Sequence, residues 1–315
     1  MMLFSHCLTR IAGVLAAVAV LAGNALATTI TLRPIADTSL YGDDPDNNLG
    51  AELTLPAGAT SPLPETELPR TNRALIKFNV VGALPPSAII QTASLSVTVM
   101  QLPSVQRSNS VFELRRVLLD WGEGNKKSSS PSKNGAPATA GEATWNARFF
   151  PSNLWATPGG AFSVDFANVI SATVPVSGLG AYTFATTPAL VADIREWLTN
   201  SSANFGWVLR SQSESIPYTN RRFGSREDTN NAPVLTIIFE ANDLRIDLVE
   251  RSGDRLDIHF TAQPQQTYTV KYRNSVATGS WLTLTNVPAQ ATVTNVIVCD
   301  STSASPQRYY RIEAP

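Results

Sequence analysis

Histidine, cysteine and lysine are scarce in this chain, and their scarcity limits the chemistry it can perform. Its 315 residues include two histidines, two cysteines and five lysines. The 24 cationic residues nearly balance the 25 acidic ones, giving a net charge of −1. Because no long basic run occurs either, the charge distribution gives no reason to expect a nucleic-acid partner.

Residues 1–27 have the pattern of a secretory signal peptide. Arg10 supplies a positive charge, residues 11–22 form an apolar core, and Ala25-Leu-Ala27 is a small-x-small cleavage site. The apolar core is shorter than the roughly 20 residues that a bilayer-spanning helix needs. We therefore predict cleavage after Ala27, secretion or display at the cell surface, and a mature chain without a transmembrane segment.

Loss of this segment would leave one histidine and one cysteine in the mature chain. His6, Cys7 and Arg10 would be removed, so no intramolecular disulfide could form and the net charge would change from −1 to −2. A Ser-His-Asp or Cys-His mechanism would have to use His259 as its base. Since His259 lies in the middle of a strand pattern at residues 256–260, a structural role is expected. The sequence favours binding or structure over catalysis and leaves the enzyme question open.

Apolar and polar residues alternate in many short segments, which is the pattern of half-buried β-strands. Over residues 93–100 every second side chain from Leu95 is apolar. The same alternation over residues 73–80 places Arg73 and Lys77 on one face of a strand. About ten such strands, separated by turn signals, predict an all-β fold with a jelly-roll-type β-sandwich over residues 28–241.

One helix is predicted within this sandwich. Thr187 can cap it, Pro188 suits the first helical position, and apolar residues recur at helical spacing over residues 190–198. Trp197 belongs to this apolar stripe. It is therefore predicted to lie in the core and not on a sugar-binding surface.

A second domain is predicted after Asn242, where an apolar strand gives way to polar residues. Six strand-like runs follow in residues 243–315, with a hairpin turn at Ser252-Gly-Asp254. Residues 268–273, a tryptophan and the closing Arg308-Tyr-Tyr-Arg311 resemble the small fibronectin-III-like sandwiches of secreted bacterial proteins. This resemblance implies a smaller Ig/fibronectin-III-like β-sandwich that acts as a spacer or docking surface.

A series of short motifs runs through the larger domain, which ends in Phe223-Gly-Ser-Arg-Glu and Asn231-Ala-Pro-Val-Leu-Thr-Ile-Ile-Phe239. The earlier motifs are Ala36-Asp-Thr, Asn47-Asn-Leu-Gly50, Arg73-Ala-Leu-Ile-Lys-Phe78, Trp121-Gly-Glu-Gly124, Thr144-Trp-Asn146, residues 193–198 and Phe205-Gly-Trp-Val-Leu209. In this order the motifs resemble those of the DNRLRE-type domain, a secreted β-sandwich module of bacteria and archaea. Some members of this family are carbohydrate-binding modules for alginate, an anionic polyuronate. The resemblance therefore implies a secreted carbohydrate-binding protein with an anionic polysaccharide as partner.

Charged residues just before the closing strand of the larger domain, at residues 234–239, form the predicted ligand site. If the strand of residues 73–80 meets the closing strand, cations from both converge on one concave face. Guanidinium groups match carboxylates in a bidentate manner, so such a face would suit a uronate chain. The predicted ligand-binding residues are Arg73, Lys77, Tyr218, Arg222, Arg226 and Glu227.

Two other functions stay open at this point. A polysaccharide lyase or a glycosidase could use the same charged residues, although the sequence defines no carboxylate pair at a set separation. The chain could also be a structural surface protein whose ion pairs use up these charges, for example Arg226 with Glu227 or Asp120.

Residues 42–50 form an acidic loop rich in the oxygen ligands that hard cations bind. Its predicted metal ligands are Asp43, Asp44, Asp46 and Asn48. The loop lacks the ligand spacing and the terminal glutamate of an EF-hand, and Asx turns explain the same composition. Calcium is therefore one of two open interpretations of this loop.

The residues between Gly124 and Glu142 depart from the pattern of the DNRLRE-type family as a long insertion. They consist mainly of Gly, Ser, Pro and Lys, including Lys126, Lys127 and Lys133, with hardly an apolar side chain. Such a composition cannot pack through apolar contacts, so a long mobile loop is predicted.

Overall fold

The computed structural model describes residues 27–85, 88–129, 134–241, 244–264, 266–275, 278–301 and 308–314. Residues 1–26 of the predicted signal peptide, Lys133 and the boundary residue Asn242 lie outside these ranges. Antiparallel β-strands are the main secondary structure of the described residues, with one α-helix, which confirms the predicted all-β sandwich class.

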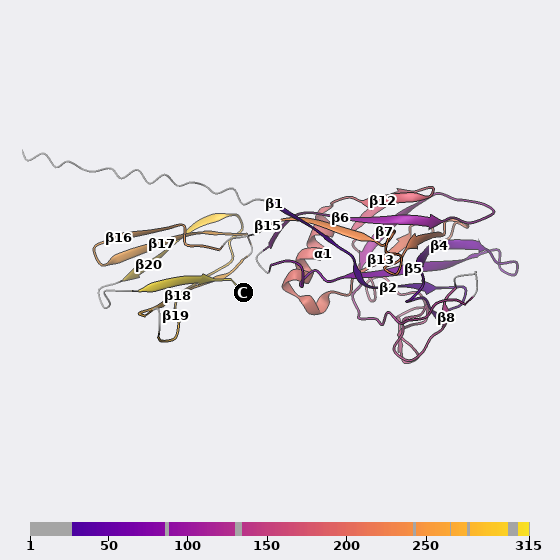
Figure 1. Ribbon diagram of the computed structural model, residues 1–315, viewed down its shortest axis with the longest axis horizontal. Helices are drawn as coiled ribbons and strands as arrows, with labels where there is room; N and C mark the ends of the chain where they lie inside the picture. Colours follow the sequence, from indigo (N-terminus) through magenta and orange to yellow (C-terminus); the bar gives the residue numbers. More distant parts are fainter. Residues whose placement is uncertain are drawn as a thin grey trace, which may run out of the picture.

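The larger sandwich consists of two sheets that share one strand, β4 (Thr54–Pro62) (Figure 1). The first sheet contains β1 (Ala27–Leu32), β15 (Val234–Ala241), β6 (Ala88–Gln101), β12 (Gly180–Phe184) and β14 (Arg221–Gly224). The second contains β2 (Pro34–Tyr41), β5 (Pro69–Phe78), β13 (Trp207–Ser211), β7 (Ser110–Arg116) and β11 (Ala172–Val176). Two short ladders pair β3 (Asn47–Asn48) with β8 (Ala136–Pro137), and β9 (Ala147–Phe149) with β10 (Asn153–Leu154).

Strand β4 changes sheets at Gly58. Its residues up to Ala57 pair with β14, and those from Gly58 onward pair with β5. Gly58 has a φ of 110°, and an added Cβ would lie 2.7 Å from the carbonyl oxygen of Thr219. A glycine is required there because other residues rarely adopt this backbone conformation and no space exists for a side chain.

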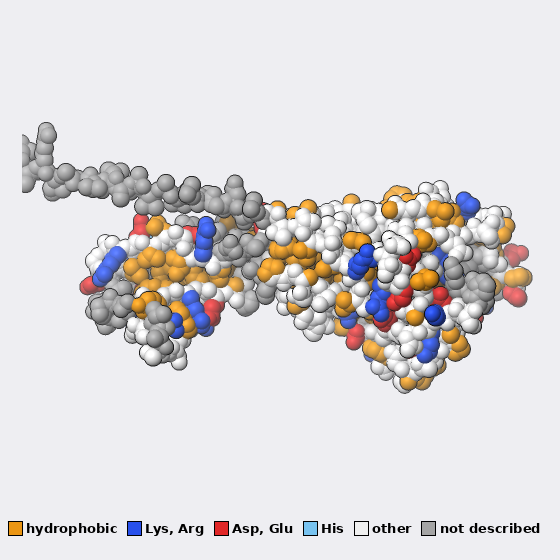
Figure 2. Space-filling view, in the orientation of Figure 1, with side chains coloured by type: hydrophobic (Ala, Val, Ile, Leu, Met, Phe, Trp, Pro, Cys, Tyr) orange, Lys and Arg blue, Asp and Glu red, His pale blue; other side chains and the backbone are white. Residues whose placement is uncertain are grey.

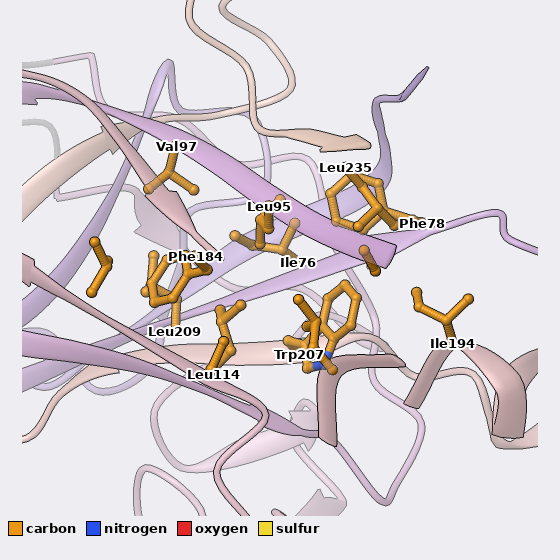
Figure 3. Close-up of a cluster of buried hydrophobic side chains, with 14 of the residues drawn as sticks. Ile76, Phe78, Leu95, Val97, Leu114, Phe184, Ile194, Trp207, Leu209 and Leu235 are labelled. Atoms are coloured by element: carbon orange, nitrogen blue, oxygen red, sulfur yellow. The ribbon is translucent and has the colours of Figure 1, made fainter. Parts of the chain in front are cut away.

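The main core lies between these two sheets, as the side chains in Figure 3 show. Helix α1 (Pro188–Thr199) closes one end of it, with the Thr187 hydroxyl accepting a hydrogen bond from the Leu190 amide at 3.0 Å. A 3-10 turn, η1 (Ser201–Ala203), follows. Trp197 is fully buried against Trp207, with ring centroids 4.5 Å apart. The predicted helix, its cap and the core position of Trp197 are all confirmed.

The outer face of β5 is also buried, which the alternating pattern did not predict. Ile76 enters the main core, whereas Leu75 on the opposite face packs in a second core. That second core is completed by Trp121, Trp155 and Phe166, from the long connections that cover the second sheet. This covering layer also carries Asp120 and Glu123, two of the charged residues discussed below.

The described part of residues 122–142 is held by specific hydrogen bonds, so the predicted mobile loop is wrong there. The Asn48 side chain donates to the Glu123 carbonyl at 2.8 Å and accepts from the Lys126 amide at 3.1 Å. The Glu142 carboxylate accepts from the Thr139 amide at 2.6 Å and pairs with Lys126 at 3.3 Å. Buried polar side chains thus replace the apolar contacts that the composition lacks.

A smaller sandwich follows, built from two three-stranded sheets. One contains β16 (Leu248–Ser252), β17 (Arg255–Ala262) and β20 (Thr294–Ser301), and the other β19 (Leu282–Val287), β18 (Tyr268–Arg273) and β21 (Tyr309–Glu313). Its core includes Ile258, Phe260 and Val270. His259 points away from this core, with Nε2 3.4 Å from a carboxylate oxygen of Glu250. The exposed thiol of Cys299 lies on β20.

We expect the two sandwiches to fold separately, with a boundary near Asn242. Among the described residues, strands up to Ala241 pair with one another, and strands from Leu248 pair with one another. Fragments 28–241 and 243–315 should each give a cooperative melting transition and a dispersed NMR spectrum. Aggregation of the larger fragment alone, when the full chain stays soluble, would show that the two share a core.

Candidate functional site

The two strands expected to carry the site are not neighbours, so the expected convergence is wrong. Strand β15 is bonded on its two edges by β1 and β6, and β5 is bonded by β2, β4 and β13. No edge of β15 is left for β5. The six predicted ligand-binding residues therefore do not converge on one face.

Arg73 on β5 is bonded entirely within the protein. Its Nε and Nη2 donate to the two carboxylate oxygens of Glu214, each at 2.8 Å. Its Nη1 donates to the carbonyl oxygens of Gly159 and Gly160 at 2.7 and 2.8 Å. Arg210 approaches the same Glu214 carboxylate at 3.1 Å. This geometry joins β5 to the covering layer and leaves Arg73 few donors for a ligand.

Lys77 lies on the same face of β5 as Arg73 but in a more open setting. Its ammonium is 3.8 Å from the Asp120 carboxylate and 5.8 Å from the centroid of the Phe205 ring. Both distances are long for strong interactions, and the Asp120 side chain is half exposed. Lys77 therefore contributes little to the stability of the sandwich.

Tyr218 and Arg222 both line an open hollow beside β14. The hollow has a volume of about 260 Å³, and its other polar lining residues include Asn220, Gln101 and Ser104. Arg222 pairs in register with Gln101 of β6, which places these two residues side by side in the first sheet. Tyr218, Arg222 and two residues with side-chain amides thus line one space.

The backbone of Tyr218 is held in a left-handed conformation, with a φ of 65°. A bulky residue in this region is an outlier that costs of order 1–3 kcal/mol. Two backbone hydrogen bonds hold it there: its amide donates to Thr60, and its carbonyl accepts from the Ser108 amide, both at 3.0 Å. The fold thus keeps a strained tyrosine at the hollow.

Arg222 is largely buried, with 8% of its surface exposed. Burial lowers the pKa of its guanidinium, and the nearby Tyr41, Glu52 and Asp43 act in the opposite direction. Its Nη2 donates to the Asn134 side-chain oxygen at 3.4 Å. The surrounding residues therefore orient this cation at the wall of the hollow.

Arg226 and Glu227 lie elsewhere, in an acidic cluster with Asp37 and Glu123. Arg226 Nη2 donates to Glu123 at 3.1 Å, and its Nε lies 3.1 Å from Glu227. The Arg226 backbone amide donates to Asp37 at 2.8 Å, and the Asp37 amide donates to Glu123 at 2.8 Å. Asp37 comes from β2, Glu123 from the covering layer and Glu227 from the turn after β14, so the fold itself gathers them.

Burial perturbs the acids of this cluster. It raises the pKa of Asp37 well above its usual range, and the negative charge of Glu227 adds to that rise. Burial also raises the pKa of Glu123, against the hydrogen bonds from the Asp37 amide and Arg226. The cluster therefore holds more negative charge than its surroundings stabilise.

The acidic loop of residues 42–50 gives its carboxylates separate partners. Asp43 lies 3.8 Å from Arg70, Asp44 accepts from Asn134 at 3.4 Å, and Asp46 accepts from Asn146 at 2.9 Å. The Asn48 side-chain oxygen accepts the Gly50 amide at 3.0 Å, which is an Asx turn. These contacts support the turn interpretation, and calcium binding by this loop remains a prediction.

Sequence reasoning missed Asp37 and Glu123 as site residues. Both stand in the motifs on which the family resemblance rests, Ala36-Asp-Thr and Trp121-Gly-Glu-Gly124. A charged residue inside each motif was the available signal. On the face of the larger sandwich that Figure 2 shows, cationic and acidic side chains are intermingled and are not separated by sign.

No protein-family model and no curated protein matches the chain. Within the ranges that the structure describes, no helix has the length and apolar character needed to cross a membrane.

Proposed function

We propose that the chain is an exported, non-catalytic binding protein for an anionic, uronate-containing polysaccharide, and that the hollow beside β14 receives one sugar unit. The observation that carries the proposal is the presence of Tyr218, Asn220 and Arg222 in one open hollow. Its volume of about 260 Å³ lies just below the range of small-molecule pockets, about 300–1,000 Å³. Such a space suits one unit of a chain that continues over the surface.

Each lining group has a task that fits a uronate. A tyrosine ring offers an apolar face with a polar tip, which suits the mixed surface of a sugar. Arg222 brings a positive charge to the wall of the hollow, which favours a carboxylate nearby, and neighbouring side chains orient it. The amides of Asn220 and Gln101 can exchange hydrogen bonds with hydroxyl groups. Compared with the site expected from sequence, Tyr218 and Arg222 remain and Arg73 is left out.

Binding of alginate oligosaccharides by the mature protein tests this proposal. We expect Tyr218→Ala to weaken binding at least tenfold, because it removes the ring while keeping a Cβ and the same backbone conformation. Affinity should fall as salt rises, because charge attraction contributes. Titration calorimetry at two salt concentrations measures both effects, with Lys77→Ala as the control variant that keeps wild-type affinity.

Two results would contradict the proposal. Equal affinity of wild-type protein and Tyr218→Ala would place any binding elsewhere. Release of unsaturated or shortened products from alginate or pectin would instead favour a lyase or a glycosidase.

A further inference from the structure

We propose that Asp37, Glu123 and Glu227 form a binding site for a divalent cation of the calcium type. This site is separate from the hollow beside β14 and from the acidic loop of residues 42–50. It therefore stands independently of polysaccharide binding.

The geometry of the three carboxylates suits one ion. Each offers an oxygen atom, and these three atoms lie within 4.8 Å of one another. Calcium binds oxygen at about 2.3–2.6 Å, so one ion can touch atoms that are about 5 Å apart. Among the described residues, no other three acidic, histidine or cysteine side chains come together in this way.

Two oxygen atoms of this cluster are buried without a hydrogen-bond partner in the described structure. They are Oδ1 of Asp37 and Oε2 of Glu227. Asp37 is only 1% exposed, and its other oxygen, Oδ2, accepts the Arg226 amide at 2.8 Å. A buried carboxylate oxygen without a donor is costly. A cation held by this cluster could supply the partner that such an oxygen lacks.

The charge of the cluster also calls for a divalent ion. With all three carboxylates ionised, as cation binding requires, Arg226 would leave two negative charges without a counter-charge. The Arg226 guanidinium contacts Glu123 and Oε1 of Glu227, and therefore does not reach the two atoms without partners. One divalent cation would balance the remaining charge.

The donor set favours calcium over other metals. All three ligands are carboxylates, whereas zinc sites usually include histidine or cysteine. The Glu123 and Glu227 side chains are 19% and 22% exposed, so water can supply the remaining ligands. Two long glutamate side chains permit the irregular, six- to eight-fold coordination of calcium more readily than the strict octahedron of magnesium.

The test uses mature protein from which cations have been removed by a chelator. Titration calorimetry with calcium chloride should show one site per chain. Saturation at a hundredfold excess over Kd should raise the Tm of the larger sandwich by roughly 5–10 °C. Magnesium at the same concentration should shift the Tm less.

Matched variants identify the ligands. Glu227→Gln, at a partly exposed position, should lower calcium affinity at least tenfold and should fold. Asp37→Asn should do the same, and it should melt above the wild type when calcium is absent, because it removes a buried charge. The control, a double variant Asp44→Asn with Asp46→Asn, should keep the full calcium response.

Three outcomes would overturn the site. The first is wild-type protein that shows neither binding heat nor a Tm shift with calcium. The second is a calcium response that survives in Glu227→Gln but disappears in the Asp44→Asn, Asp46→Asn double variant, which would assign the ion to the acidic loop. The third is stabilisation by Asp37→Asn without any calcium binding by the wild type, which would mean that the cluster holds only a shared proton.

Discussion

Replacement of Trp207 by alanine should lower the free energy of unfolding of the larger sandwich by about 3–5 kcal/mol. The side chain is fully buried between the two sheets, against Trp197 and Phe78, with ring centroids 4.5 and 6.1 Å away. Its removal would leave a cavity in a close-packed core and break both aromatic contacts. Few other substitutions in the chain remove as much buried apolar surface.

The indole of Trp207 also has a polar partner. Its Nε1 donates to Asp193 Oδ2 at 2.8 Å, and the same oxygen accepts from the Ser171 hydroxyl at 2.5 Å. Burial raises the pKa of Asp193, which these two hydrogen bonds oppose. Trp207→Phe would keep most of the apolar volume but lose this donor. We therefore expect about 1–3 kcal/mol for the phenylalanine variant, less than for alanine.

Chemical denaturation of the mature protein measures both losses. Trp281→Ala is the control, because Trp281 lies in the smaller sandwich, where Arg273 and Arg311 lie 4.4 Å from its ring. It should leave the transition of the larger sandwich unchanged. If Trp281→Ala shifted that transition, the two sandwiches would unfold as one cooperative unit and the separate treatment of Trp207 would fail.

The elements that sequence could predict are those decided by local pattern. The helix at Pro188–Thr199 follows from Thr187, Pro188 and an apolar stripe, all within one short segment. The burial of Leu75 could not be predicted in the same way. Its face of β5 is covered by side chains such as Trp155 and Phe166, which lie about 80–90 positions later in the chain. Alternation defines two faces, but only the tertiary structure decides whether both are covered.

In the candidate sites, too, local pattern could be predicted from the sequence, whereas contacts between distant residues could not. The sequence drew attention to charged residues near the closing strand, including Arg226 and Glu227, but it could not show which residues they contact. Arg226 reaches Asp37 across 189 positions and Glu123 across 103. Strand order decides such meetings, and nothing in a single strand's pattern reveals its neighbours. Tyr218 and Arg222 do line one hollow, and only four positions separate them in the chain.

Arg73→Ala should destabilise the larger sandwich by about 3 kcal/mol without changing its affinity for polysaccharide. The Arg73 and Glu214 side chains are only 12% and 15% exposed, and they form a two-point ion pair at 2.8 Å. Removing one partner of such a pair typically costs about 3–5 kcal/mol, because the other charge stays buried. The lower end is expected because Arg210 still contacts Glu214 at 3.1 Å.

Lys77→Ala is the matched control, four residues along the same face of β5. Its 3.8 Å contact with the half-exposed Asp120 should contribute at most about 1 kcal/mol. Denaturation curves and alginate titrations of both variants separate stability from binding. Weaker alginate binding by Arg73→Ala at unchanged stability would return this arginine to the ligand site and move that site away from the hollow. Because all four polar contacts of Arg73 are to protein atoms, we expect the loss to appear in stability alone.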